Sequence, residues 1–170
     1  MSTTFLISDT HFGHANILNF VNDDGTRVRP HWTDVDVMNE DMIERWNRTV
    51  GTNDKVYHLG DVVMNRRYLS IVDRLNGRKE LVLGNHDIFD TTDFLKHFKR
   101  VHGSVKLDSF VLTHIPVHPL MLPRWAYGNI HGHVHSNSLT DSLYKNVSVE
   151  VIDYTPVPFD LILKEMKETR

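Results

Sequence analysis

Five short apolar segments of this 170-residue chain each end directly in side chains that can bind a metal ion or transfer a proton. These side chains are Asp9 and His11, Asp61, Asn85 and His86, His114, and His133 and His135. The chain has twelve histidines and no cysteine, which excludes a cysteine zinc site, a disulfide scaffold and a thiol nucleophile. Nitrogen and oxygen ligands of this kind suit manganese, iron, zinc or nickel, and are too rich in nitrogen for a dedicated calcium site. The pattern therefore predicts a metal centre built from histidine, aspartate and asparagine.

The elements that would position these side chains alternate between strand and helix. Because the loops beyond the carboxyl ends of strands in an open α/β sheet meet at one crevice, residues distant in sequence are expected to meet there. The apolar patterns predict strands at 4–8, 55–59, 80–83, 109–113 and 147–152, and helices at 34–50, around 69–75, from 91 or 92, and at 160–168. Residues 22–32 show turn residues and no periodicity, so their course is not predicted.

Length and composition are typical of one globular α/β domain over residues 1–170. With 40% hydrophobic and 24% charged residues, the chain is not expected to be disordered, collagen-like or a coiled coil. A net charge of −3 gives no basic surface for long nucleic acid. The sequence shows neither an export signal nor an apolar run of about 18 residues, so we expect a soluble cytoplasmic protein without a membrane partner.

The polar segments resemble a known motif series when they are taken together and in order. Asp9-Thr10-His11, Gly60-Asp61, Gly84-Asn85-His86-Asp87, His114 and Gly132-His133-Val134-His135 resemble the motifs of the calcineurin-like metallophosphoesterase superfamily. The longer forms, Asp-Thr-His-Phe-Gly-His-Ala-Asn-Ile from residue 9 and Tyr-His-Leu-Gly-Asp from residue 57, look like a small single-domain branch found in bacteria and phages. The resemblance implies an α/β sandwich of two mixed β-sheets flanked by helices.

The same resemblance implies two metal sites and one catalytic side chain. It assigns one metal to Asp9, His11, Asp61 and His135, and the second metal to Asp61, Asn85, His114 and His133. Manganese is the expected metal, and iron, zinc and nickel are the alternatives. Two cations about 3.5–4 Å apart need an anionic bridge, which Asp61 would supply, and they acidify a shared water whose hydroxide form attacks phosphorus. His86 would contact the phosphate and protonate the leaving oxygen.

The function that the resemblance implies is hydrolysis of a phosphate ester. We expect a phosphodiesterase acting on a small nucleotide-like or cyclic phosphodiester, with a phosphomonoesterase as the alternative, and a non-catalytic metal-binding scaffold as the alternative from another class. Many superfamily members carry a second aspartate soon after the Gly-Asp motif, which orients the catalytic histidine. This chain reads Val62-Val63-Met64-Asn65 there, so the group that orients His86 is left open, as are the physiological substrate and the oligomeric state.

Three further side chains are candidates for substrate contact. His14 lies three residues after His11, and could equally be a surface or helix-capping histidine. Arg66 and Arg67 follow the Gly-Asp motif and could bind a phosphate through two parallel hydrogen bonds, or they could simply begin a solvated helix. His58 lies inside an expected strand and is predicted to be packed rather than reactive.

Overall fold

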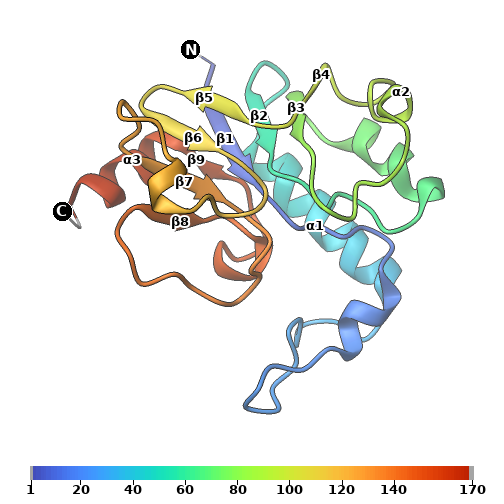
Figure 1. Cartoon of the computed structure of the whole chain (residues 1–170). Coiled ribbons are helices and arrows are strands. Elements are labelled where there is room, and N and C mark those ends of the chain that lie inside the picture. The colour runs from blue at the N-terminus through green and yellow to red at the C-terminus, as the bar shows by residue number, and fades with distance from the viewer. Residues whose placement is uncertain (1, 169–170) are drawn as a thin grey trace.

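Two β-sheets pack against each other, with helices around them (Figure 1). The computed structural model describes residues 2–168. The first sheet has the strand order β4-β3-β2-β1-β9 and the second has the order β5-β6-β7-β8. The strands are β1 (Thr4–Ile7), β2 (Lys55–His58), β3 (Arg78–Val82), β4 (Arg100–His102), β5 (Val105–Leu107), β6 (Phe110–Leu112), β7 (Gly128–His131), β8 (Tyr144–Asn146) and β9 (Val157–Pro158).

Both sheets are mixed. Strands β1 to β4 run parallel to their neighbours, and β9 pairs antiparallel with β1. In the second sheet β6, β7 and β8 are parallel, and β5 pairs antiparallel with β6. The prediction of an α/β fold with two mixed sheets flanked by helices is therefore confirmed.

The alternation of side chains along β1 divides the core in two. Phe5 and Ile7 face the helical layer and pack in one apolar cluster with Met38 and Trp46. Leu6 faces the other way, into a second cluster that includes residues of both sheets. Successive strand side chains point to opposite faces, so a strand buried on both faces reads as a continuous apolar run. Burial on both faces fixes β1 at the centre of the fold, directly before the first polar motif.

The helices agree with the sequence prediction in the longest cases. The α-helices are α1 (Val35–Thr49), α2 (Thr91–Phe94) and α3 (Phe159–Glu168), and 3₁₀ helices span Ala15–Asn19, Arg66–Arg74, Pro119–Met121 and Val149–Val151. The Asp34 side chain caps α1 by accepting hydrogen bonds from the backbone N–H groups of Asp36 (2.8 Å) and Val37 (3.0 Å). Within residues 2–168, no helix is both long and apolar enough to cross a membrane.

The predicted strand at 147–152 is wrong. β8 ends at Asn146, and Val149–Val151 form a 3₁₀ helix instead. The alternating valines are typical of a strand, but after one parallel bridge to Ser8 the chain turns away from the sheet at Ser148. The predicted helix around 69–75 is the 3₁₀ helix Arg66–Arg74. The predicted strands do not include β4, β5, β7, β8 and β9, each of which has only two to four residues.

Candidate metal centre

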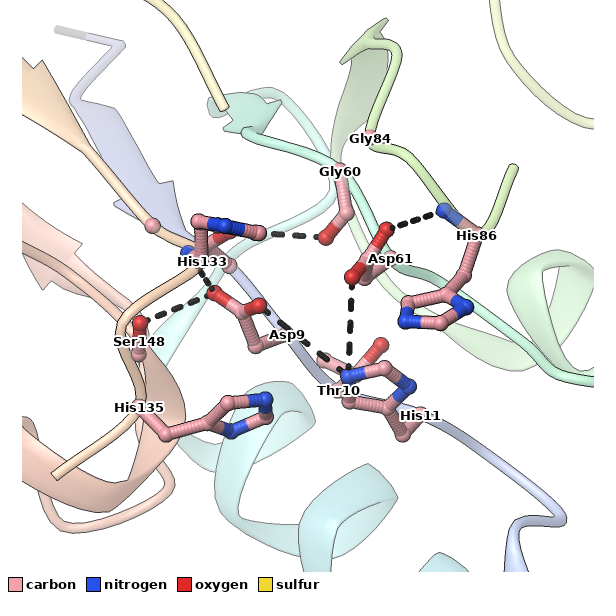
Figure 2. Close-up of polar contacts among 12 residues, drawn as sticks. Asp9, Thr10, His11, Gly60, Asp61, Gly84, His86, His133, His135 and Ser148 are labelled. Atoms are coloured by element: carbon pink, nitrogen blue, oxygen red, sulfur yellow. Dashed lines mark hydrogen bonds and ion pairs between the residues drawn. The ribbon is translucent and has the colours of Figure 1, made fainter. Parts of the chain in front are cut away.

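The predicted ligands meet at one edge of the sandwich. Asp9 follows β1, Asp61 follows β2 and Asn85 follows β3, while His114 and His133 follow β6 and β7 of the second sheet. Because these strands are parallel within each sheet, their carboxyl ends lie at the same edge. Figure 2 shows the histidine rings arranged around the carboxylates of Asp9 and Asp61. The structure thus brings together side chains from positions 9 to 135.

One group of candidate ligands consists of Asp9, His11 and His135, whose nitrogen and oxygen atoms all lie within 4.8 Å of one another. Within residues 2–168, Asp9 Oδ1 and both ring nitrogens of His11 are buried without a hydrogen-bond partner. Leaving one such atom unpaired costs about 1–3 kcal/mol, and a cation would satisfy them. Burial and the nearby charge of Arg29 hold the pKa of His11 well below its ordinary value, which keeps the ring neutral and able to bind a metal.

The second group consists of Asp61, His114 and His133, whose ligand atoms again lie within 4.8 Å of one another. His114 donates its Nδ1–H to the backbone carbonyl of Leu59 at 2.7 Å, which directs Nε2 toward the other candidate ligands. Asn85 adds an amide oxygen, since its Oδ1 lies 3.0 Å from His114 Nε2. These residues match the donor set expected for the second metal.

Asp61 lies between the two groups. Its Oδ2 is 3.3 Å from His114 Nε2 and 3.7 Å from His11 Nε2, so one oxygen faces both rings. Figure 2 shows the contact between Asp61 and His11. Burial alone would raise the pKa of Asp61, but the interaction with His114 and the hydrogen bond from the His86 N–H outweigh it and lower the pKa to about 2. The carboxylate is therefore ionised and placed where an anionic bridge between two cations would be needed.

Backbone strain is concentrated at these ligands. Eight non-glycine residues within residues 2–168 have positive φ, and five of them are candidate ligands: Asp9 (60°), His11 (47°), Asp61 (56°), His133 (72°) and His135 (50°). Such conformations cost about 1–3 kcal/mol each and persist where surrounding structure or function imposes them. Two glycines make the close packing feasible, because a Cβ on Gly84 would lie 2.2 Å from Asp61 Oδ1 and one on Gly132 would lie 2.4 Å from Asp9 Oδ2.

Three residues that the sequence analysis missed support the first group. Ser148 donates to Asp9 Oδ2 at 2.8 Å, which fixes the carboxylate. Glu150 Oε1 accepts from His135 Nδ1 at 3.1 Å and from Arg29 Nε at 2.9 Å. Because Glu150 contacts Nδ1 of His135, the other ring nitrogen, Nε2, is the one that can bind a metal. Burial alone would lower the pKa of His135, but the hydrogen bond and charge of Glu150 outweigh it and raise the pKa. The fully buried Arg29 also donates to the carbonyls of Asp9 (2.6 Å) and Thr10 (2.9 Å).

Asp87 supports the second group, and its place beside Asn85 and His86 was the available signal. Its carboxylate accepts hydrogen bonds from the backbone N–H groups of Asp61 (2.8 Å), Val62 (3.0 Å) and Gly84 (2.8 Å). These bonds join the loops after β2 and β3. Asp87 therefore positions the loop that carries Asp61.

His86 lies at the exposed mouth of the site. Its backbone N–H donates to Asp61 Oδ1 at 2.9 Å, and its ring lies 5.7 Å from the His11 ring, measured between centroids (Figure 2). Within residues 2–168 no side chain hydrogen bonds to the His86 ring, so the structure supplies no replacement for the missing aspartate. His14 also lies here, with its ring 5.6 Å from that of His11 and its buried Nδ1 unpaired within the same residues.

The side-chain contacts of Arg66 and Arg67 within residues 2–168 are with Asp93 and Tyr68, and not with a candidate metal ligand. Arg66 pairs with Asp93, and the Arg67 guanidinium lies 4.8 Å from the ring centroid of Tyr68. His58 is packed, as predicted, and its Nδ1 accepts from the Gly60 N–H at 3.2 Å. Burial lowers the pKa of His58 to about 3, so the ring stays neutral.

Comparison with known proteins shows similarity to one protein over nearly the whole chain and to another over about half of it. The Uncharacterized protein MJ1445 of Methanocaldococcus jannaschii is 36% identical over 178 residues, covering 96% of this chain and 91% of that protein. The Gene 66 protein of Mycobacterium phage L5 is 32% identical over 92 residues, which cover 51% of this chain and 41% of the phage protein.

The fold is also similar to that of a solved structure. The crystal structure of the protein of unknown function AQ665 from Aquifex aeolicus has a TM-score of 0.74 and 27% identity, and the match covers 96% of this chain and 99% of that chain. No family model matches the sequence. The identity and coverage shared with the Methanocaldococcus protein show that this chain belongs to the family of the Uncharacterized protein MJ1445.

Proposed function

We propose that this chain is a dinuclear-metal-dependent phosphohydrolase with the sandwich fold of the calcineurin-like metallophosphoesterases. The observation that carries the proposal is the position of Asp61 Oδ2, which is 3.7 Å from His11 Nε2 of one ligand group and 3.3 Å from His114 Nε2 of the other. Asp9 and His11 have buried polar atoms without a hydrogen-bond partner within residues 2–168. These atoms support cation binding, because buried polar atoms are normally paired and a bound cation would satisfy them.

The residues fit two divalent cations, with manganese as the expected metal. Asp9, His11, Asp61 and His135 would hold one, and Asp61, Asn85, His114 and His133 would hold the other. When bound, the two cations supply Lewis acidity toward phosphate oxygens and lower the pKa of water. The chain's own contribution is to fix these ligands in advance, through the Ser148, Glu150 and Asp87 contacts.

His86 is the side chain proposed to move a proton. It is exposed beside the two groups while its backbone is anchored to Asp61, so the ring can reach a substrate without being a metal ligand. Its role is to donate a proton to the leaving oxygen as the phosphorus–oxygen bond breaks. The lack of a hydrogen-bond partner for the ring within residues 2–168 means that the substrate itself would complete its orientation.

A diester fits the surroundings of the centre better than a monoester. Two hollows adjoin the ligands: one of about 650 Å³ includes His135, and one of about 350 Å³ includes Asn85 and His114. A phosphodiester carries two substituents, and each hollow can take one of them. A monoester would leave one hollow without an occupant, so it remains the second candidate.

The test is the initial rate of hydrolysis of a nitrophenyl phosphodiester and the matching monoester by metal-stripped protein, with and without manganese. We expect manganese-dependent turnover that is faster on the diester. Asp61→Asn should abolish turnover and weaken manganese binding, whereas His86→Ala should lose turnover and keep both metals. His97→Ala is the matched control, because His97 contacts Asp73.

Two results would contradict the proposal. Metal binding without hydrolysis of either ester or of a panel of phosphate esters would favour a metal-binding scaffold. A His86→Ala protein with the full rate would remove His86 as the proton donor and leave the metal ligands in place.

A further inference from the structure

The larger hollow beside the metal centre has the features of a binding site. It has a volume of about 650 Å³, within the usual range of small-molecule sites, and His135 forms part of its wall. Its other walls come from residues 17–28 and from Ser136 and Asn137. The segment around residues 20–28 projects from the body of the molecule (Figure 1). The role proposed below for this hollow rests on the proposed function, because a ligand bound there would lie beside the metal centre through the shared residue His135.

One wall of the hollow is apolar and includes an exposed aromatic ring. Phe20 is 49% exposed and Val21 is 61% exposed, and both line the hollow together with Val28. The Phe20 ring lies edge-on to that of His14, with 5.6 Å between ring centroids and an interplanar angle of 83°. His14 in turn is 5.6 Å from His11. A row of rings therefore leads from a metal ligand to the apolar wall.

The hollow also has a polar rim with negative charge, formed by Asn22, Asp23, Asp24, Ser136 and Asn137. Ser136 donates a hydrogen bond to Asn22 Oδ1 at 3.0 Å, which joins the two segments of the chain that form this rim. The residues that line the hollow include no lysine or arginine among those described. Such a rim can bind hydrogen-bond donors, and it repels a further phosphate.

We propose that this hollow holds the base of a nucleoside phosphate whose phosphate lies at the metal centre, with Phe20 packed against the base. A nucleobase is planar and stacks on aromatic side chains. Its amino groups can donate hydrogen bonds to carboxylate and amide oxygens. An aliphatic substituent would use the apolar wall and leave the polar rim unpaired. Asp23 and Asp24 favour a nucleoside with a single phosphate over a longer polyphosphate or an oligonucleotide.

Two product-like probes that differ only in the base test this inference. Adenosine 5′-monophosphate and ribose 5-phosphate share the phosphate and the sugar, and each is titrated calorimetrically into the manganese-loaded protein. We expect adenosine monophosphate to bind roughly tenfold more tightly or better. Phe20→Ala should remove most of this preference, while leaving the affinity for ribose 5-phosphate unchanged. Because Phe20 is half-exposed, the variant is expected to fold.

Leu95→Ala is the matched control, since Leu95 has the same exposed fraction of 49% and does not line the hollow. Equal affinity for the two probes in the unmodified protein, or a preference that survives in Phe20→Ala, would overturn the inference. Tighter binding of a ribose bisphosphate than of ribose 5-phosphate would overturn the proposed selectivity for a single phosphate. These readouts need no turnover, so an inactive protein that still prefers adenosine monophosphate would contradict only the proposed hydrolase activity.

Discussion

Gly132→Ala is the substitution whose effect can be worked out most fully from the structure. A Cβ at this position would lie 2.0 Å from Ser8 Oγ and 2.4 Å from Asp9 Oδ2. To reach the 3.4 Å of an ordinary contact, the Asp9 carboxylate must move by about 1 Å. That movement stretches the hydrogen bonds that Asp9 Oδ2 accepts from Ser148 (2.8 Å) and from the His133 N–H (2.9 Å).

The expected effect is a loss of metal affinity with a moderate loss of stability. Disturbing the contacts that orient a ligand typically weakens metal binding by about 10–100-fold. Overpacking costs about 1–3 kcal/mol, and for a chain of this length each kcal/mol lowers Tm by roughly 2–4 °C. Manganese binding is measured by calorimetry on metal-stripped protein, and Tm is measured by circular dichroism in the same buffer without metal.

Gly103→Ala is the control for this experiment, because a Cβ there would meet nothing within 4 Å. We expect it to match the unmodified protein in both measurements. If Gly132→Ala bound manganese with unchanged stoichiometry and affinity, the carboxylate of Asp9 would not be a metal ligand held in place by the close approach of Gly132.

Two other predictions concern contacts that support the site and the fold. Glu150→Gln should weaken manganese binding by roughly tenfold, because His135 loses the charge that orients it. Glu40→Gln, which alters only an exposed pair with Arg74, should leave the affinity unchanged, and equal losses would contradict the assignment. Burial lowers the pKa of His58 to about 3, so the unfolded chain gains a proton near pH 6.5 that the folded chain does not accept. The free energy of unfolding should therefore decrease as the pH is lowered from about 6.5 toward about 3. His58→Gln should reduce the slope of the urea-measured unfolding free energy against pH by roughly 1.4 kcal/mol per pH unit, and equal slopes for the two proteins would refute this.

The candidate metal ligands could be found from sequence because each one lies within a few residues after the end of a strand. Asp9, Asp61 and His114 take their positions from the parallel strands before them, and the strands are visible as apolar runs. Parallel pairing then places the ends of the runs at one edge, without any knowledge of the loops. The helix over 34–50 could also be predicted, because Met38, Met42 and Trp46 recur at helical spacing on one face, and all three side chains are buried.

The supporting residues could not be found in this way, because their roles depend on which loops meet in space. Arg29 lies in a segment without periodicity, yet it is fully buried between Asp9, Thr10 and Glu150. Glu150 lies in a stretch whose alternating valines are typical of a strand, and its role follows only once that stretch turns as a 3₁₀ helix. The pairing of Arg66 with Asp93 likewise depends on the position of the α2 helix, which is distant in sequence.

Each ligand group takes residues from both sheets, and this has a consequence for cohesion. Asp9 and Asp61 follow strands of the first sheet, and His114, His133 and His135 follow strands of the second. Bound cations would link the two sheets, and each would add about 2.7 kcal/mol to the free energy of unfolding when the metal is present at a hundred times its Kd. A chelator would remove this stabilisation. The backbone amides of Ser8 and Val149, which join the sheets at this edge, would then exchange their hydrogens faster. Metal supply would thus set how firmly the two sheets stay together.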